Sequence, residues 1–157
     1  METITISSHL ILSAPDGFRK MTEEELSNQS FYKQAPQWAV TDPDRHMILS
    51  AASQTLNGFS ALLLNAKDIV KQSSQKLSDL LKPYGYRADR LRTVAVGGES
   101  GEALRYYYCR EGIEMTGDMI VVKKGKTVYH IYSYMRTEAA GSCSGVLSQL
   151  LEEAEWK

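Results

Sequence analysis

Residues 103–135 read ALRYYYCREGIEMTGDMIVVKKGKTVYHIYSYM, and this stretch decides the fold. Aromatic and β-branched residues dominate it, and such residues favour strands. Glycine marks two reversals, at Glu111-Gly112 and Lys124-Gly125, as in tight turns between strands. Because a tight turn joins antiparallel neighbours, the stretch predicts three consecutive antiparallel strands.

Both faces of the outer two strands are largely apolar. Along the first strand, Leu104, Tyr106 and Tyr108 share one face, whereas Ala103, Tyr107 and Cys109 share the other. The third strand alternates in the same way, with Val128, His130, Tyr132 and Tyr134 against Tyr129, Ile131 and Met135. A sheet that is apolar on both sides needs cover on both sides. The sequence therefore predicts an α+β fold, a three-layer α/β/α sandwich with a central, mainly antiparallel sheet.

Two amphipathic helices are predicted to supply the cover. Residues 65–82 have apolar side chains at helical spacing, with Asn65 as the cap and Pro83 as the stop. The apolar positions are Ala66, Ile69, Val70, Leu77, Leu80 and Leu81. Residues 143–154 repeat this spacing, which predicts a C-terminal helix that ends at Trp156.

A third, short helix is predicted after Thr22, ending before Ser30. Thr22 and Glu25 have the spacing of a capping box. Carboxylates in a first turn offset the helix dipole, so the run Glu23-Glu24-Glu25 is interpreted as structural rather than catalytic.

Further strands are expected on either side of the first two helices. Residues 2–14 alternate loosely and suit one bent strand or two short ones broken at Ser7-Ser8. A hairpin is predicted from 38–41 and 46–53, and a short strand over 92–96. Turns are predicted at Pro15-Asp16-Gly17, Asn57-Gly58 and Gly97-Gly98.

Length and composition bound the class of protein. A chain of 157 residues is expected to form a single domain, residues 1–157. The hydrophobic share of 43% and the charged share of 24% are those of an ordinary globular protein. The net charge is −1 and basic residues are scattered along the sequence, which argues against a nucleic-acid partner.

The sequence also leads to an expectation about the location of the protein in the cell. No apolar run approaches the roughly 20 residues that span a bilayer. The first residues lack a basic segment followed by an apolar core, so no signal peptide is predicted. A cytoplasmic location is the expectation, although a chain whose leader had been removed would look similar. The two cysteines, Cys109 and Cys143, are expected to be free buried thiols.

The segment Gly141-Ser-Cys-Ser-Gly145 matches a nucleophile elbow with Cys143 as the nucleophile. In that motif the acid and the histidine follow the nucleophile in sequence. The twelve residues after Gly145 contain no histidine and no aspartate. We therefore interpret the segment as a small-residue linker followed by a helix cap at Ser142 or Ser144.

Other polar residues also have structural interpretations. Asp42, Asp44 and His46 alternate, but three ligands are fewer than the usual four to six, and Asp-Pro-Asp is ordinary turn chemistry. His9 and His130 stand alone, without a nearby nucleophile.

The glycines at 97–101 lack a phosphate-binding pattern. The lysines of a predicted hairpin tip, Lys123, Lys124 and Lys126, keep that turn soluble. No catalytic residue, metal ligand or cofactor is predicted.

The tyrosines at 106–108, 129, 132 and 134 allow two interpretations. As core residues they fill a sandwich while their hydroxyls reach polar rims. As functional residues they line a pocket or contact a partner. We favour the core interpretation, because both faces of the strands carry them and aromatic cross-strand pairs stabilise sheets.

Three segments and the closing helix together carry a family resemblance. They are residues 12–18 (LSAPDGF), residues 94–106 with their Gly-Gly turn, and residues 121–129 (VVKKGKTVY). This order of elements resembles the PsbP-like superfamily, which includes a photosystem accessory protein, a nuclear Ran-binding protein and bacterial DcrB-like lipoproteins. The resemblance implies the same three-layer sandwich and a non-enzymatic binding role. The signal and lipidated cysteine of the lipoprotein branch do not occur in this chain.

A non-catalytic domain that binds another protein is the functional expectation, with partner, oligomeric state and binding residues left open. The alternative is a small-ligand or lipid-binding protein with a pocket between sheet and helix. An enzyme of unrecognised type is the third possibility.

Overall fold

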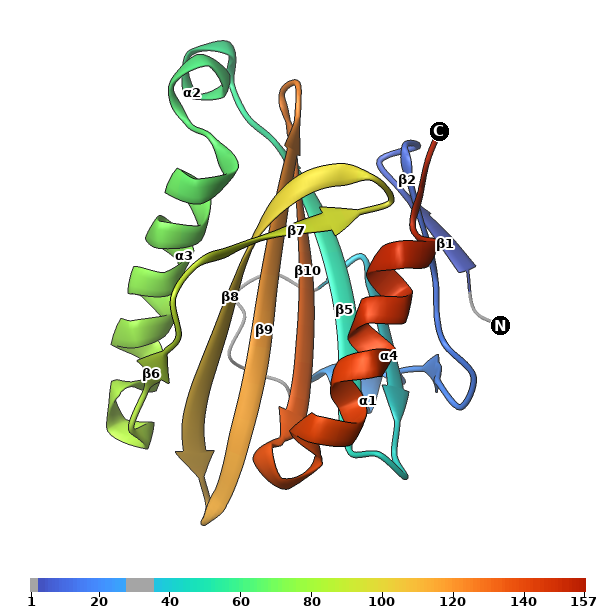
Figure 1. Ribbon diagram of the computed structural model, residues 1–157, viewed down its shortest axis with the longest axis vertical. Coiled ribbons are helices and arrows are strands. Elements are labelled where there is room, and N and C mark those ends of the chain that lie inside the picture. Colours follow the sequence, from blue (N-terminus) through green and yellow to red (C-terminus); the bar gives the residue numbers. More distant parts are fainter. Residues whose placement is uncertain (1–2, 28–35) are drawn as a thin grey trace.

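The structure, a computed structural model, describes residues 3–27 and 36–157. Its centre is an eight-stranded sheet in the order β3-β4-β5-β10-β9-β8-β6, with β7 also paired to β8 (Figure 1). Every strand pair is antiparallel. The strands are β3 (Arg19–Lys20), β4 (Trp38–Asp42), β5 (Met47–Thr55), β6 (Arg87–Ala88), β7 (Arg92–Val96), β8 (Glu99–Arg110), β9 (Ile113–Lys124) and β10 (Thr127–Arg136).

The three predicted central strands are β8, β9 and β10, which confirms the prediction made for residues 103–135. Glu111 and Gly112 have φ angles of 54° and 81°, as a two-residue hairpin turn requires. This turn pairs Arg110 with Ile113 and fixes the register of β8 against β9. β8 begins at Glu99, earlier than predicted, directly after the turn at Gly97-Gly98.

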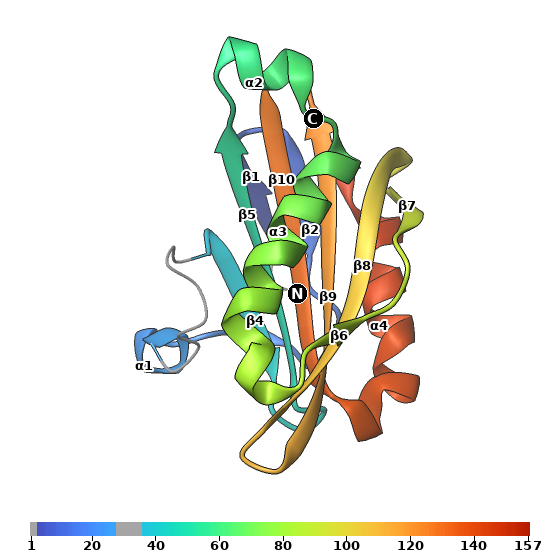
Figure 2. The ribbon, with the colours of Figure 1, turned by 90° about the vertical axis from the view of Figure 1, so that its left-hand side faces the viewer.

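One face of the sheet is covered by α3 (Ala66–Leu81) (Figure 2). Asn65 caps this helix as predicted, and Asp68 completes a capping box with it. Buried side chains of α3 pack with Tyr106 and Tyr108 of the sheet. Leu80 was expected on the buried face but is 43% exposed, because the helix face that meets the sheet is narrower than the apolar pattern. A 3-10 turn, Lys82–Tyr84, follows and contains Pro83.

The opposite face is covered by α4 (Ala140–Glu153) together with a second, three-stranded sheet (Figure 1). That sheet has the order β1-β2-β11, from β1 (Thr3–Ile6), β2 (Leu10–Ser13) and β11 (Glu155–Trp156). The N-terminal segment thus forms two short strands, and Ser7 and Ser8 at positive φ form the break between them. The prediction of an α+β fold around a mainly antiparallel sheet is confirmed.

Two predictions about α4 are wrong. The helix starts at Ala140 after a 3-10 turn, Thr137–Ala139, so residues 141–145 lie inside it and form no linker. Its N-cap is Ala139 without a side-chain hydrogen bond, and Ser142 Oγ donates to the Ala139 carbonyl at 3.0 Å. The helix ends at Glu153, and Trp156 lies in β11, because that segment pairs with β2 instead of continuing the helix.

The two remaining helices are short. α1 (Glu23–Ser27) starts with the predicted capping box, in which Glu25 N donates to Thr22 Oγ1 and Thr22 N donates to Glu25 Oε1. α2 (Gly58–Leu63) was not predicted, since Asn57-Gly58 was interpreted as a turn. Asn57 instead caps the helix, accepting a hydrogen bond of 2.7 Å from Ser60 N. Among residues 3–27 and 36–157, no helix is long and apolar enough to cross a bilayer.

Candidate functional site

A groove of about 590 Å³ lies between α4 and β7, with β8 as its floor. Arg92, Val94 and Ala95 of β7, Arg105 and Tyr107 of β8, and Leu147, Leu151 and Glu152 of α4 line it. The groove is open to solvent. Its walls combine apolar residues with Arg92, Ser148 and Glu152, and its floor carries Arg105 and Tyr107. An open groove suits an extended chain better than a small molecule, which usually binds in an enclosed pocket.

The polar floor is built on the buried ion pair between Arg105 and Asp118. Arg105 Nε donates to Asp118 Oδ1 at 2.9 Å and Arg105 Nη2 donates to Oδ2 at 3.0 Å. Ser133 Oγ donates a third hydrogen bond to Oδ2, at 2.9 Å. The Asp118 side chain is fully buried, and its hydrogen bonds offset the cost of burying a carboxylate. The hydrogen bond to Asp118 also raises the pKa of Arg105.

Arg92 stands at the mouth of the groove with its side chain 45% exposed. Its Nη2 atom lies 4.0 Å from Asp118 Oδ1, beyond hydrogen-bond distance. Since Asp118 already accepts bonds from Arg105 and Ser133, the Arg92 guanidinium is the cation of the groove that can meet an incoming carboxylate.

Tyr107 and Asp89 form the end of the groove near β6. Tyr107 Oη donates to Asp89 Oδ2 at 2.7 Å, which raises the pKa of Tyr107. The Arg87 guanidinium stacks over the Tyr107 ring at 5.0 Å from its centroid. Asp89 is thus engaged with Tyr107.

A free strand edge borders the groove. β7 pairs with β8 on one side, and within the described part of the chain no strand pairs with its other side. Figure 1 shows β7 running across the front of the sheet toward α4. Unpaired N–H and C=O groups along such an edge can pair with a strand from another chain.

The two walls of the groove are fastened together where β7 turns into β8. Gly97 N donates to the Leu151 carbonyl, and Trp156 Nε1 donates to the Val96 carbonyl, both at 2.8 Å. Gly97 has a φ of 56°, and a Cβ at this position would lie 2.9 Å from the Ala154 carbonyl carbon. Glycine is therefore required for the close approach of this turn to α4.

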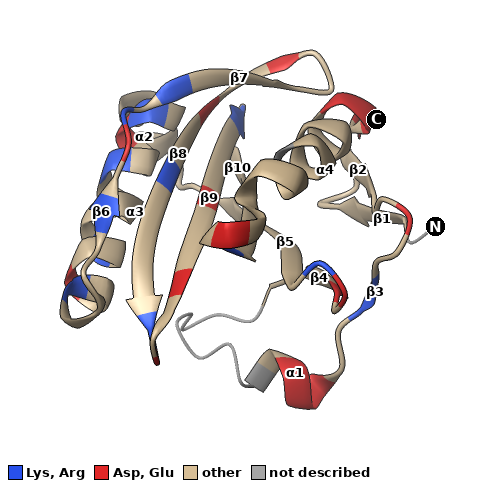
Figure 3. Cartoon of the chain, turned by 60° about the horizontal axis from the view of Figure 1, so that its bottom comes forward, with Lys and Arg blue, Asp and Glu red and all other residues tan. Residues whose placement is uncertain are grey.

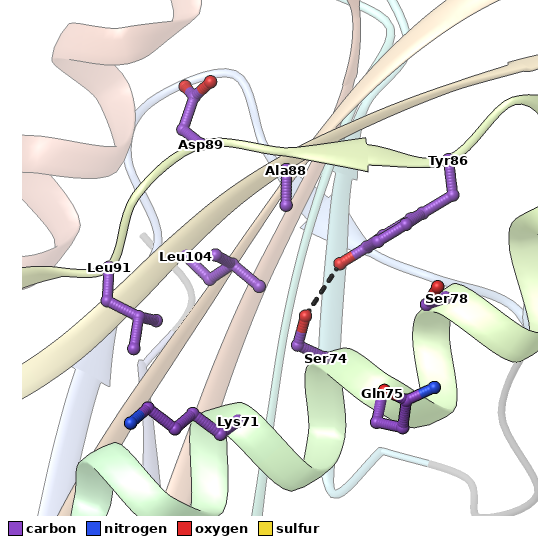
Figure 4. Close-up of a pocket in the computed structure, with 9 residues that line it drawn as sticks. All are labelled: Lys71, Ser74, Gln75, Ser78, Tyr86, Ala88, Asp89, Leu91 and Leu104. Atoms are coloured by element: carbon purple, nitrogen blue, oxygen red, sulfur yellow. Dashed lines mark hydrogen bonds between the residues drawn. The ribbon is translucent and has the colours of Figure 1, made fainter.

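A second, smaller groove of about 280 Å³ lies on the other face, between α3 and β6 (Figure 4). Tyr86 Oη and Ser74 Oγ share a hydrogen bond of 2.9 Å across it. Leu104 forms its floor, and it too is open to solvent. Both grooves are open to solvent, so neither of them is an enclosed pocket beside Tyr106–Tyr108.

Charge is unevenly distributed over the molecule. Residues 67–92 carry seven basic and three acidic side chains, although basic residues look scattered in the sequence. Figure 3 shows basic residues along α3, β6 and β7, and acidic residues on α1 and at the end of α4. This arrangement favours the approach of an acidic partner from the α3–β7 side.

The cysteines, Asp42 and the histidines considered from the sequence lie apart from the groove. Cys143 is buried in α4, with its Sγ 4.0 Å from the Arg45 carbonyl, whereas Cys109 is exposed, contrary to the expectation. Asp42 accepts bonds from Asp44 N, Arg45 N and Arg45 Nη1 within its turn. No three acidic, histidine or cysteine side chains gather as metal ligands in residues 3–27 and 36–157.

The histidines and tyrosines also have structural neighbours. His130 stacks on Tyr132, and burial together with Lys76 lowers the pKa of His130, while His9 lies exposed in the β1–β2 turn. Four of the tyrosines, Tyr106, Tyr108, Tyr129 and Tyr134, are buried, which confirms the core interpretation for them, and Tyr107 lines the groove.

The ion pair in the groove floor was missed, although the sequence contained a signal for it. Arg105 and Asp118 are opposite charges in the middle of the two strands, each between uncharged neighbours. Counting back from the Glu111-Gly112 turn places them directly opposite each other, as observed. No pattern in the sequence predicted that α4 and β7 would lie over this ion pair.

The element order and sheet topology give an α+β fold that is similar to the PsbP-like fold, as solved structures show. The cyanobacterial PsbP (CyanoP) of Synechocystis sp. PCC 6803 has a TM-score of 0.70 at 11% identity over 99% of this chain and 92% of that one. LpqN of Mycobacterium tuberculosis, involved in cell envelope biogenesis, has a TM-score of 0.63 at 17% identity over 94% and 83%.

The Ran-binding protein Mog1p of Saccharomyces cerevisiae has a TM-score of 0.61 at 10% identity over 98% of this chain and 94% of that one. No protein-family model matches the sequence, and no curated protein matches it significantly. At these identities the likeness establishes the fold, and the resemblance to the PsbP-like superfamily is confirmed at that level.

Proposed function

We propose that this chain is a non-catalytic binding domain that holds an extended segment of a partner protein along the free edge of β7. In this proposal residues 1–157 act as one domain, a three-layer α/β/α sandwich, in the cytoplasm. The observation that carries it is the unpaired β7 edge beside an open groove. Strand addition to a sheet edge is a recurring mode of peptide recognition.

The shape and charge of the groove support a protein segment with an acidic residue. Main-chain hydrogen bonds to β7 would supply affinity, and Val94, which is partly exposed, would contact an apolar side chain of the segment. Arg92, exposed and beyond hydrogen-bond distance of Asp118, would pair with a carboxylate. The protein-binding role of Mog1p, which has a similar fold, is consistent with this function.

The register of β7 identifies the backbone groups that face the free edge. Gly97 and Gly98, both at positive φ, form a two-residue turn, so Val96 and Glu99 are a hydrogen-bonded pair. Alternation then makes Ala95–Ser100 a non-hydrogen-bonded pair. The N–H of Ala95 therefore points away from β8, toward a strand that would add to the edge.

Ala95→Pro tests the proposal, because it removes this outward N–H and leaves the β7–β8 ladder intact. Ala95→Thr is the matched control, since it adds side-chain bulk at an exposed position and keeps the N–H. We expect peptides selected from a random display library on the wild-type chain to bind Ala95→Thr and to lose at least about tenfold in affinity for Ala95→Pro. Equal binding to both variants, or no selected peptide, would contradict the proposal.

A small anionic ligand is the second candidate, supported by the volume of the groove and by Arg92. Thermal unfolding of the wild-type chain and of Arg92→Ala with a panel of small carboxylates distinguishes the two functions. A carboxylate that stabilises the wild type and Ala95→Pro equally, but not Arg92→Ala, would favour the small ligand.

A further inference from the structure

α2 exposes an apolar face to solvent. Phe59 is 73% exposed, Leu62 88% and Leu63 62%, and none of the helix residues is buried. Their spacing of i, i+3 and i+4 places all three on one side of the helix. They make up half of the six large hydrophobic side chains that are exposed in the described part of the chain. A cluster of this kind is typical of an interaction site.

The helix is anchored in this position at both ends. Asn57 caps its first turn, Leu64 N donates to the Ser60 carbonyl at 2.9 Å, and Lys123 Nζ donates to the Ala61 carbonyl. Leu56 and Leu64, on either side, pack against the core beneath α3. The flanking leucines thus hold the helix while its own apolar residues point outward.

α2 also occupies an end of the molecule. Figures 1 and 2 place it at one end of the long axis, beside the tip of the β9–β10 hairpin. Leu56 N donates to the Lys126 carbonyl at 2.7 Å, which joins this tip to the residues before α2. Neither described groove includes an α2 residue, so the apolar side chains lie on a projecting surface.

Lysines lie near this apolar tip. Lys123 and Lys126 come from the hairpin and Lys67 follows in the first turn of α3, whereas Lys124 lies over the Trp156 ring. Of the nearby acids, Glu99 pairs with Lys124 at 3.3 Å, and Asp68, which accepts a bond from Asn65 N, keeps its negative charge. The tip therefore combines exposed apolar side chains with excess positive charge.

We propose that α2 is a membrane-docking element that inserts Phe59, Leu62 and Leu63 into the interface of an anionic bilayer. Lys67, Lys123 and Lys126 would then lie at the level of the lipid headgroups. Apolar residues that enter the interface beside basic residues that attract anionic lipids are the two components of peripheral membrane binding.

The kind of cation distinguishes a bilayer from a protein partner. Every basic residue named at the tip is a lysine, whereas the cations of the groove are Arg92 and Arg105. Protein–protein interfaces are enriched in arginine and depleted of lysine. A projecting apolar surface with lysines around it fits a bilayer, which deforms around inserted side chains. The inference is independent of the proposed groove function.

Co-sedimentation of the full chain with phosphatidylcholine vesicles, with and without about 30% phosphatidylserine, tests the docking. We expect binding to the anionic vesicles that weakens in high salt. The triple variant Phe59→Ser, Leu62→Ser, Leu63→Ser should lower the vesicle partition coefficient at least about tenfold. These side chains are exposed, so the fold should persist, and the far-ultraviolet circular dichroism of the variant checks this.

Two controls separate insertion from simple charge attraction. Leu80→Ser removes an exposed leucine of α3 that lies outside α2 and should leave binding unchanged. The pair Lys67→Glu, Lys126→Glu should weaken binding to anionic vesicles and reduce its salt dependence. Phe59→Trp should give a blue-shifted emission on vesicle addition if the residue leaves water.

Three outcomes would overturn the proposal. They are no binding to anionic vesicles, unchanged binding of the triple variant, and no emission shift for Phe59→Trp despite binding. If the wild type ignores vesicles but self-associates in size-exclusion chromatography, and the triple variant is monomeric, the apolar face contacts a second copy instead. Loss of a selected protein partner in the triple variant, without vesicle binding, would likewise assign the face to a protein.

Discussion

The ring of Tyr106 lies over Gly117, its cross-strand neighbour in the β8–β9 pair. A Cβ at position 117 would overlap this ring and would lie 2.6 Å from Tyr106 Oη. Tyr106 is fully buried and also stacks against Tyr108, so it has no room to move away. An aromatic ring that covers a strand glycine restores the packing that the missing side chain would provide.

Gly117→Ala should therefore destabilise the protein by about 1–3 kcal/mol, because overpacking forces the buried ring out of its position. Urea unfolding measures the change. Gly145→Ala is the matched control, since a Cβ there meets no atom within 4 Å and alanine favours the interior of α4. That control should be neutral or stabilising by up to about 1 kcal/mol. A Gly117→Ala variant as stable as the wild type would show that Tyr106 is mispositioned.

Asp118→Ala should cost about 3–5 kcal/mol, because it leaves Arg105 and Ser133 without their shared acceptor. The double variant Arg105→Leu, Asp118→Leu should recover most of this loss, since an apolar pair of similar volume can replace a buried ion pair. Chemical denaturation of Arg105→Leu, of Asp118→Leu and of the double variant measures the coupling between the two side chains. Additive losses would mean that the two side chains act independently.

Folding stability should fall as the pH drops below about 6.5, through His130. Burial, and secondarily Lys76, lowers the pKa of His130 from its ordinary value of 6.5 in the folded chain. The unfolded chain then takes up its proton first as the pH falls, so protonation favours unfolding. Replacing this histidine, in His130→Gln, should flatten the pH dependence between 6.5 and the folded-state pKa.

Leu150→Asp should unfold the protein or destabilise it by more than about 4 kcal/mol, because Leu150 is fully buried in the α4 core and the new carboxylate would have no partner. Thermal unfolding measures the effect. Ser142→Asp places the same side chain in the exposed first turn of α4, where it offsets the helix dipole and gives up the exposed hydrogen bond from Ser142 Oγ to the Ala139 carbonyl. It should change stability by no more than about 0.5 kcal/mol. A Leu150→Asp variant that melts with the parent would contradict the position of α4.

Much of the central sheet was predictable because its determinants are local. The Glu111-Gly112 turn and the turn at Gly125-Lys126, one residue later than predicted, fix which strands pair, and alternation then assigns each side chain to a face. α3 was predicted for the same reason, from its spacing and its Asn65 cap. α2 was missed because Asn57-Gly58 is also a strong turn signal and a six-residue helix has too little periodicity to outweigh it.

The groove could not be predicted, because its parts are distant in the sequence and contain no shared motif. β7 and α4 meet through Gly97 N and the Leu151 carbonyl, and β11 pairs with β2 at the opposite end of the chain. Such contacts depend on the packing of whole elements, and no local pattern of residues 92–96 or 155–156 encodes them.

The sequence by itself thus determined the hairpins between residues 103 and 135, the caps of α1 and α3 and the two apolar faces of the strands, since these follow from backbone preferences and spacing over a few residues. Only the tertiary structure decided that Arg92 and Arg105 meet α4 across a groove and that Phe59, Leu62 and Leu63 remain exposed. Whether these side chains are covered or exposed depends on contacts between elements that are distant in the sequence. Such contacts form only when all the elements pack together.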